Sequence, residues 1–557
     1  MVHSPLVDAL LCGSAYPDRP EAVELVQTHI SYVFLLSGAD HSPSETGRGP
    51  SEFVYKIKKP VDFGFLDFST LERRRFFCLE EVRLNSRLAP DIYLGVVPVF
   101  KEEKERGAVF RVGEVFIREG DAECASAVAA EAAGSVVVEY AVKMRRIASD
   151  TILDEMLRQE RATAETLQRV ARSIAAFHQK AEPLCRAEQV DTIAYNIMDN
   201  FSRIESFAGD EPGATIIRRR LEGLREFSAK FLAENRALLE ERVRGGFIRD
   251  CHGDMHVDHV VVTENIAIFD CIEFSERLRL CDTVADAGFL SMDLEYLGRG
   301  DLAKVFEAEY KKVSGDAAPD ALWNFYKCYR AVVRGKVASL KSIGSDIDET
   351  ERSDAIRDAI KHFHLADLYA KGGAKPVLVV VSGLTATGKS TLVRALKGTS
   401  SMKVISTDAT RRDIFNIPIG EDRRAQFGKD LYTEESVSRV YEAVFKEGER
   451  WLGLGRSVIL DATFSKKRYI DSARDIAERC DALCFVVECV AGEASVKARM
   501  EKRSKEKDSL SDATYETYKK MKESFEPIEG DCLRINTDGD PVGIAGLLIK
   551  KVFGVMQ

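Results

Sequence analysis

The sequence lacks the features of membrane and secreted proteins. None of its 557 residues belongs to an apolar run approaching the ~20 residues that span a bilayer. The N-terminus has neither the basic segment nor the apolar core of a secretory signal. The 12 cysteines are scattered, with no CxxC pair and no His/Cys cluster at zinc spacing. These absences predict a cytoplasmic protein with reduced thiols and no membrane partner.

Positive charge is also in deficit, since 80 Lys and Arg face 90 Asp and Glu, for a formal net charge of −10. This balance argues against a protein dedicated to nucleic-acid backbones, although a local basic groove remains compatible with it. The length predicts several compact units. A short Gly- and Lys-containing linker near 370–376 divides the chain into predicted domains 1–370 and 376–557.

The most informative motif lies at the start of the second domain. Five apolar residues at 377–381 predict a buried strand, residues 383–390 fit G-x-x-x-x-G-K-[ST], and helical spacing follows. Such a loop presents backbone N–H groups at a helix N-terminus, where they bind phosphate. Lys389 is expected to reach the β- and γ-phosphates of ATP or GTP, and Ser390 to bind Mg²⁺. The predicted nucleotide-binding residues are Gly383, Thr385, Ala386, Thr387, Gly388, Lys389, Ser390 and Thr391.

Apolar segments at 403–406, 457–460, 483–490 and 532–536 alternate with helical spacing and predict an α/β domain with a parallel sheet. Ligands bind at the carboxyl ends of such strands. The predicted roles there are those of a kinase.

Asp408 follows the second strand and is expected to accept the proton of a substrate hydroxyl, with Arg411 holding an anionic group. Asp461 ends the third strand and is a candidate Mg²⁺ ligand. Arg499 and Arg503, spaced i, i+4, have the form of an arginine-bearing lid. By these positions the second half resembles the small-molecule and polynucleotide kinases of the P-loop class.

The first domain is predicted to have two lobes. Strands alternate with one helix, at 71–88, over about 1–140, and helices dominate about 141–370. Lys56 lies in a predicted strand and Glu81 in the helix. A loop bearing His252-Gly253-Asp254 is followed by a hairpin bearing Asp270.

These residues, in this order, resemble the aminoglycoside phosphotransferase family, a relative of the protein kinases. The resemblance implies that Lys56, held by Glu81, grips the α- and β-phosphates. Asp254 would take the proton of an attacking hydroxyl, and Asp270 would bind Mg²⁺. His259 stands where that family usually has an asparagine as second metal ligand, and imidazole suits transition metals better than Mg²⁺.

The whole chain is similar to a family that fuses this kinase-like domain to a P-loop kinase. The combined fold class is α/β and α+β, a bilobal kinase-like domain followed by a parallel-sheet domain. The predicted function is transfer of the γ-phosphoryl group of ATP to a hydroxyl of a small molecule. Two alternatives remain open: a degenerate N-terminal sensor that regulates a P-loop ATPase, and a 5′-hydroxyl polynucleotide kinase.

Overall fold

The structure is a computed structural model of the chain. It describes residues 4–38, 52–64, 66–104, 107–113, 135–205, 212–344, 347–373, 375–399, 402–415, 433–480, 482–503 and 515–538. The chain folds into two compact units. The first comprises residues 1–193, 236–290 and 306–317, and the second comprises 194–235, 291–305 and 318–557. The predicted domain boundary near residues 370–376 stays a prediction.

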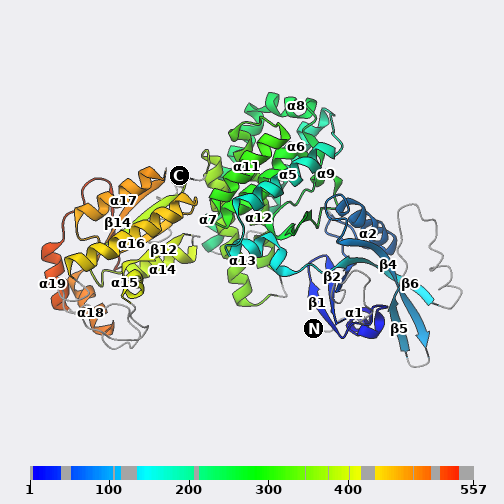
Figure 1. Cartoon of the computed structure of the whole chain (residues 1–557), viewed down its shortest axis with the longest axis horizontal. Coiled ribbons are helices and arrows are strands. Elements are labelled where there is room, and N and C mark those ends of the chain that lie inside the picture. The colour runs from blue at the N-terminus through cyan, green and yellow to red at the C-terminus, as the bar shows by residue number, and fades with distance from the viewer. Residues whose placement is uncertain are drawn as a thin grey trace. The chain divides into compact units, whose positions relative to one another are not determined.

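A six-stranded antiparallel sheet begins the first unit, in the order β1-β2-β3-β6-β4-β5 (Figure 1). Helix α2 (Leu71–Asn85) begins after the N-cap Thr70, whose side chain accepts the N–H of Arg73, and it packs on β6 and β4. Strand β6 passes the predicted lobe boundary near residue 140. The strands are β1 (Ala22–Gln27), β2 (Ser31–Ser37), β3 (Phe53–Lys58), β4 (Tyr93–Lys104), β5 (Gly107–Val112) and β6 (Ser135–Arg145).

The rest of the first unit consists of helices and two short antiparallel strand pairs, β7 with β10 and β8 with β9. Both pairs flank the loop that carries His252, Gly253 and Asp254. The elements are α1 (Pro5–Leu10), α4 (Leu153–Arg158), α5 (Ala164–Lys180), α8 (Arg236–Arg244), β7 (Ile248–Asp250), the 3₁₀ turn η3 (Val257–His259), β8 (Val260–Val262), β9 (Ile266–Ile268), α9 (Glu276–Arg279) and β10 (Leu280–Asp282).

Helices α6 (Glu188–Glu205), α10 (Thr283–Tyr296) and α11 (Gly300–Ser314) contribute residues to both units. Helices α7 (Pro212–Glu234), α12 (Asp320–Ser342) and α13 (Glu349–Ala370) lie in the second unit. Gly335 of α12 lets this helix approach α13 closely, because a Cβ there would lie 2.5 Å from the ring of Phe363.

The second unit also contains a five-stranded parallel sheet in the order β12-β13-β11-β14-β15. Its strands are β11 (Val377–Ser382), β12 (Lys403–Ser406), β13 (Val458–Asp461), β14 (Leu483–Val490) and β15 (Cys532–Asn536). Every residue of β11 is buried, as expected for a central parallel strand covered on both faces. The predicted parallel-sheet α/β architecture of this region is therefore confirmed.

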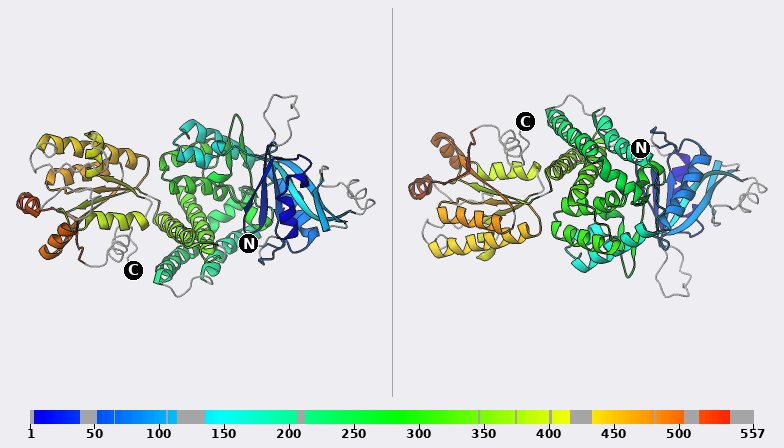
Figure 2. Two further views of the ribbon diagram at one scale, coloured as in Figure 1. Left: turned by 90° about the horizontal axis from the view of Figure 1, so that it is seen from below. Right: turned by 90° about the horizontal axis from the view of Figure 1, so that it is seen from above.

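Alternate residues of the strands feed two apolar cores. Side chains such as Leu378, Val380 and Leu460 pack with α16 (Glu434–Gly453) and α17 (Lys467–Arg479) on one face. Val379 and Val381 pack with α14 (Lys389–Thr399) on the other face. The edge-on views show the sheet between these helix layers (Figure 2). Three further helices lie near the strand ends. Helix α15 (Thr407–Ile414) follows β12, α18 (Glu493–Arg503) follows β14, and α19 (Tyr515–Ser524) precedes β15.

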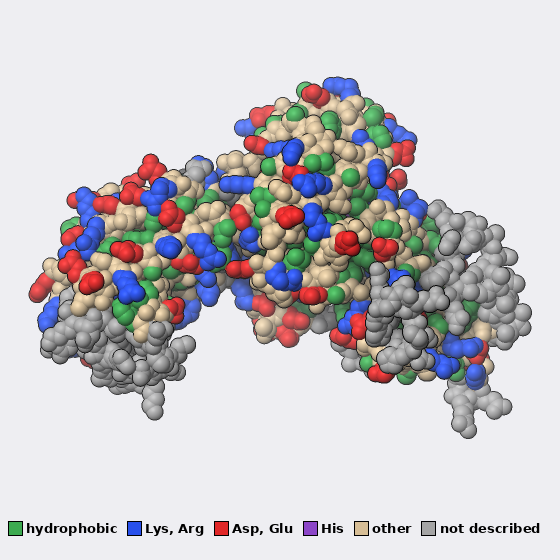
Figure 3. All heavy atoms as spheres, in the orientation of Figure 1, with side chains coloured by type: hydrophobic (Ala, Val, Ile, Leu, Met, Phe, Trp, Pro, Cys, Tyr) green, Lys and Arg blue, Asp and Glu red, His purple; other side chains and the backbone are tan. Residues whose placement is uncertain are grey.

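The surface carries both signs of charge. On the face shown in Figure 3, Lys and Arg are interspersed with Asp and Glu over the described residues of each unit. Within the described ranges, each helix is either too short or too polar to cross a bilayer.

Candidate functional site

The residues between β11 and α14 form a tight loop around backbone N–H groups. Gly383 has φ 138°, Gly388 has φ 89° and Ala386 has φ 61°, so three positions of the loop adopt conformations that favour glycine. A Cβ on Gly383 would lie 2.5 Å from the carbonyl oxygen of Cys489. The glycines of the motif are thus required by the geometry, and Ala386 holds local backbone strain of the kind found at ligand sites.

Helix α14 begins at Lys389, so Ser390 and Thr391 lie in its first turn; the N–H of Thr391 donates to the carbonyl of Gly388, and the N–H groups of Lys389 and Ser390 precede the first helical acceptors. The ammonium of Lys389 donates to the carbonyl of Leu384, 2.9 Å away across the loop. Both side chains after Lys389 are exposed. A positive side chain, first-turn N–H groups and a hydroxyl therefore occur together at the N-terminus of this helix, a combination that suits phosphate.

Strand register places the predicted acidic residues on the same edge of the sheet as this loop. Asp461 ends β13 and aligns with Val381 of β11 on one side and with Ser406 of β12 on the other. Helix α15 starts directly after Ser406, so Asp408 lies at this edge as well. The side chain of Ser406 caps the helix by accepting the N–H of Asp408. The capping hydrogen bond therefore uses the backbone of Asp408 and not its carboxylate.

Asp408 and Arg411 contact each other, with 2.9 Å between Oδ1 and Nη1. The Asp408 side chain is 47% exposed, and that of Arg411 is 12% exposed. The ring of Tyr441 stacks on that of Tyr469 with centroids 3.7 Å apart, and burial raises the pKa of the Tyr441 phenol, on which Arg411 and Asp408 have smaller and opposite effects. The predicted base and the predicted anion-binding arginine thus form a pair whose carboxylate remains accessible to solvent.

Arg499 binds the phosphate loop directly. Its guanidinium donates to the carbonyl of Ala386 at 3.3 Å and to the carbonyl of Thr537 at 2.7 Å. The hydroxyl of Thr537 donates in turn to the carbonyl of Thr387 at 2.6 Å. The Arg503 side chain and the predicted lid segment, residues 504–512, lie outside the described residues.

A second cluster of charged residues lies in the first unit, at the junction of β3, α2 and the segment after β9. The ammonium of Lys56 lies 2.8 Å from Glu81 and 2.7 Å from Asp270. Asp270 has φ 62°, and its N–H donates to the hydroxyl of Tyr93. Burial alone would raise the pKa of the Asp270 carboxyl, but Lys56 outweighs burial and holds that pKa below its usual range. The three predicted residues are therefore brought together.

Lys58 extends this cluster and was missed by sequence reasoning. It lies two residues after Lys56 on β3 and therefore on the same face. Its ammonium donates to Glu81 at 2.7 Å and also to Glu273, and it is 1% exposed. Glu81 thus bridges two lysines. The alternation Lys56-Ile57-Lys58 was the available signal, because side chains two apart in a strand point the same way.

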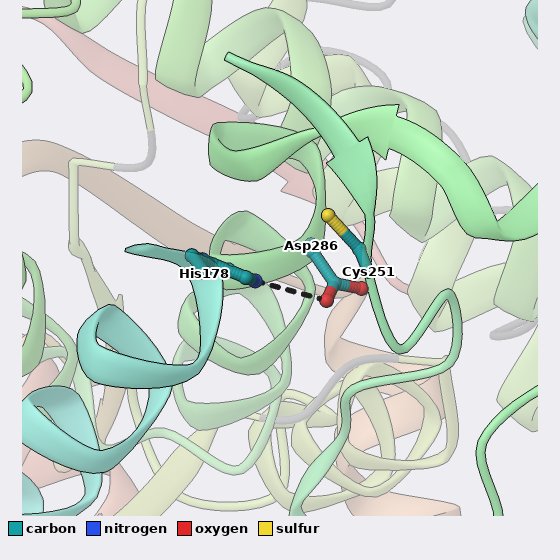
Figure 4. Close-up of side chains that lie close together, drawn as sticks. All are labelled: His178, Cys251 and Asp286. Atoms are coloured by element: carbon teal, nitrogen blue, oxygen red, sulfur yellow. Dashed lines mark hydrogen bonds and ion pairs between the residues drawn. The ribbon is translucent and has the colours of Figure 1, made fainter. Parts of the chain in front are cut away.

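The His252-Gly253-Asp254 loop is supported by a buried carboxylate. Asp286 of α10 accepts the N–H of His252 at 2.9 Å and that of Gly253 at 2.8 Å. His178 of α5 points toward the same carboxylate, 3.2 Å away, with Cys251 beside it (Figure 4). These three side chains meet metal-ligand spacing. Because Asp286 is engaged by backbone N–H groups in a fully buried position, the cluster fits a brace for the loop rather than a metal site.

Asp254 extends from this loop with 34% of its side chain exposed. His259 follows in η3, and its Nδ1 donates to the carbonyl of Asp254 at 2.9 Å, which leaves Nε2 3.6 Å from Asp270. Burial, and secondarily the neighbouring His256, lower the pKa of His259 to about 4. The imidazole is therefore neutral at pH 7, with the Nε2 lone pair turned toward a carboxylate. These donors are of types that bind divalent cations, and Asp461 and Ser390 in the second unit carry oxygen atoms of the type that Mg²⁺ prefers.

Comparison with known proteins identifies relatives of the whole chain and of its parts. Residues 378–528 match the family model for an AAA domain, AAA_33, which together with the loop and sheet makes this region a P-loop-type nucleotide-binding domain. Partial structural similarities include a gluconokinase from Sinorhizobium meliloti (16% identity, 33% of this chain, 99% of that chain, TM-score 0.24). Another is the amicoumacin kinase hAmiN in complex with AMP-PNP (13%, 64%, 92%, TM-score 0.34).

Two relatives in the genus Mycobacterium are similar over most of their length. They are the uncharacterized protein Rv2004c of Mycobacterium tuberculosis and the uncharacterized protein Mb2027c of Mycobacterium bovis. Each is 30% identical over 494 residues, which is 88% of this chain and 88% of the relative. This protein therefore belongs to the family of these uncharacterized mycobacterial proteins.

Proposed function

We propose that this protein is an ATP-dependent phosphotransferase and that its P-loop-type domain transfers the γ-phosphoryl group to a hydroxyl of a small molecule. One observation carries the proposal. The register of three adjacent parallel strands gathers the phosphate loop, Asp461 and Asp408 at one edge of the sheet. Phosphoryl transfer requires a phosphate cradle, metal ligands and a group that receives the hydroxyl proton, and the proposal assigns these roles to residues at this edge.

In the proposed step of this domain, a proton and a phosphoryl group are transferred. The acceptor hydroxyl gives its proton to Asp408 while its oxygen bonds to the γ-phosphorus, and the bond from that phosphorus to the leaving oxygen of ADP breaks. Lys389 and the first-turn N–H groups of α14 neutralise phosphate charge during this transfer. A bound Mg²⁺, held by Ser390 and Asp461, would supply further charge neutralisation.

The first unit is proposed to carry a second phosphotransfer site. Support comes from Lys56 in contact with Glu81 and Asp270, and from the partly exposed Asp254 on its braced loop. Lys56 would bind phosphate oxygens, and Asp254 would accept the hydroxyl proton.

The test is an ATP-consumption screen over metabolite pools, run on the full-length wild type, Lys389→Ala and Asp254→Asn. Matched controls are Lys397→Ala, an exposed lysine on the same helix, and Glu264→Gln, an exposed carboxylate on the hairpin after the catalytic loop. We expect Lys389→Ala to abolish one reaction, Asp254→Asn to abolish another, and both controls to match the wild type. If all five proteins consume ATP alike, the proposed sites are wrong.

The same screen separates the two alternatives from the sequence. A regulatory first unit predicts that Asp254→Asn removes no reaction but changes the rate of the Lys389-dependent one. A polynucleotide kinase predicts turnover only when 5′-hydroxyl RNA or DNA is added, with strong salt dependence. The first result would replace the proposed second phosphotransfer site, and the second result would replace the small-molecule proposal.

A further inference from the structure

Two histidines lie at the two ends of the turn η3, beside the proposed phosphotransfer site of the first unit. His256 is the residue before the turn, and His259 is its last residue. His256 and His259 stack with their ring centroids 3.8 Å apart, and both are largely buried. One potential ligand atom of each, together with one of Asp254, lies within 4.8 Å of the others. His256 was not predicted as a site residue.

In each ring, Nδ1 faces an oxygen and Nε2 faces a carboxylate of the site. For His259, Nδ1 donates to the carbonyl of Asp254, and Nε2 lies 3.6 Å from Asp270. For His256, Nδ1 lies 3.3 Å from Asp258, and Nε2 lies 3.5 Å from Asp254. Metal-binding histidines commonly donate one ring N–H to an oxygen, as His259 does, and this bond orients the other nitrogen toward the metal.

The spacing between nitrogen and carboxylate is also informative. At 3.6 and 3.5 Å, the two Nε2-to-oxygen distances exceed those of ordinary hydrogen bonds. Two ligands that each lie about 2.1 Å from one cation in tetrahedral geometry are about 3.4 Å apart. The observed separations therefore suit side chains that share a cation better than side chains that bond to each other.

We infer that this loop binds a first-row transition-metal cation, in preference to Mg²⁺, through Asp254 and imidazole nitrogens of His256 and His259, with Asp270 beside His259. The inference deepens the proposed function of the first unit and rests on it for the role of the metal. Imidazole binds these cations more strongly than it binds Mg²⁺, which prefers oxygen ligands. The imidazole of His259 would therefore make the site prefer a transition metal over Mg²⁺.

The test uses Mn²⁺ as the probe, without nucleotide, on the full-length protein. Pulsed electron paramagnetic resonance of bound Mn²⁺ reports directly coordinated imidazole through its coupling to ¹⁴N. We expect this coupling in the wild type and in His29→Asn, a control in which an exposed histidine of the β1–β2 turn is replaced. The double variant His256→Asn/His259→Asn should lose it.

Competition with Mg²⁺ gives a second readout. Tenfold excess Mg²⁺ should leave Mn²⁺ bound to the wild type, and His259→Asn should reduce the preference for Mn²⁺ by roughly 10-fold or more, by analogy with losses around other metal sites. Absence of ¹⁴N coupling in the wild type, or coupling that persists in the double variant, would overturn the inference. The wild-type spectrum is decisive even if a variant fails to fold. Since neither readout needs turnover, failure of the phosphotransferase proposal would be seen separately.

Discussion

Replacing Lys58 by methionine removes the cation that bonds two buried carboxylates, those of Glu81 and Glu273. At an effective dielectric constant of about 20, unit charges at the 2.7 Å separating Lys58 from Glu81 attract by about 6 kcal/mol, before the cost of burying them. Loss of one partner from a buried pair typically costs about 3–5 kcal/mol, because the other charge stays buried without compensation. Burial already raises the pKa of Glu273, which shows how poorly this position tolerates a negative charge.

Calorimetry of the full-length protein measures the effect. A loss of about 3–5 kcal/mol should lower the unfolding temperature of the first unit by about 6–20 °C. Lys59→Met is the matched control, because Lys59 is the next residue and lies at the surface, where its ammonium donates to Gln27. It should shift stability by about 0.5 kcal/mol or less. The double variant Lys58→Met/Glu273→Gln should recover much of the loss. If Lys58→Met is no worse than Lys59→Met, the charge cluster does not stabilise the fold as argued.

Three further predictions concern separate parts of the chain. Gly383→Ala should abolish binding of a fluorescent ATP analogue to the P-loop-type domain, because its Cβ would meet the Cys489 carbonyl at 2.5 Å, whereas Gly453→Ala, with open space around it, should bind normally. Asp286→Asn should speed amide exchange at His252 and Gly253 by about 5–150-fold, since about 1–3 kcal/mol of hydrogen bonding is lost; unchanged exchange would contradict the brace. At pH 8, iodoacetamide should modify exposed Cys12 at least about 100-fold faster than Cys489, because burial raises the pKa of the Cys489 thiol to about 12. Peptide mass spectrometry measures the two rates, and equal rates would refute this prediction.

Local sequence patterns predicted the parallel sheet well. Short, mainly apolar segments bounded by turn or loop residues indicate strands, and the predicted segments 403–406, 483–490 and 532–536 coincide with β12, β14 and β15. The phosphate loop was predictable for a similar reason, since its function depends on consecutive residues. The position of Asp461 followed from its place at the end of a strand.

Partnerships between distant residues were less accessible. Lys58 and Glu273 are separated by 215 positions, and Asp286 reaches His252 across 34. No spacing rule within one element relates such residues, so their contacts depend on the tertiary fold. The pairing of Asp408 with Arg411 was missed for a different reason: the two lie one helical turn apart, and each was assigned a separate partner in the substrate.

In the proposed reaction the phosphoryl group is transferred to an alcohol rather than to water. Incubation of the wild type with γ-³²P-labelled ATP and fractionated metabolites tests this directly, by the partition of label between organic phosphate esters and inorganic phosphate. We expect label in an organic ester with the wild type and with Asp471→Asn, a control at a solvent-accessible carboxylate of α17. The Asp408→Asn variant should lose that ester. Label released only as inorganic phosphate, at equal rates in all three proteins, would contradict it.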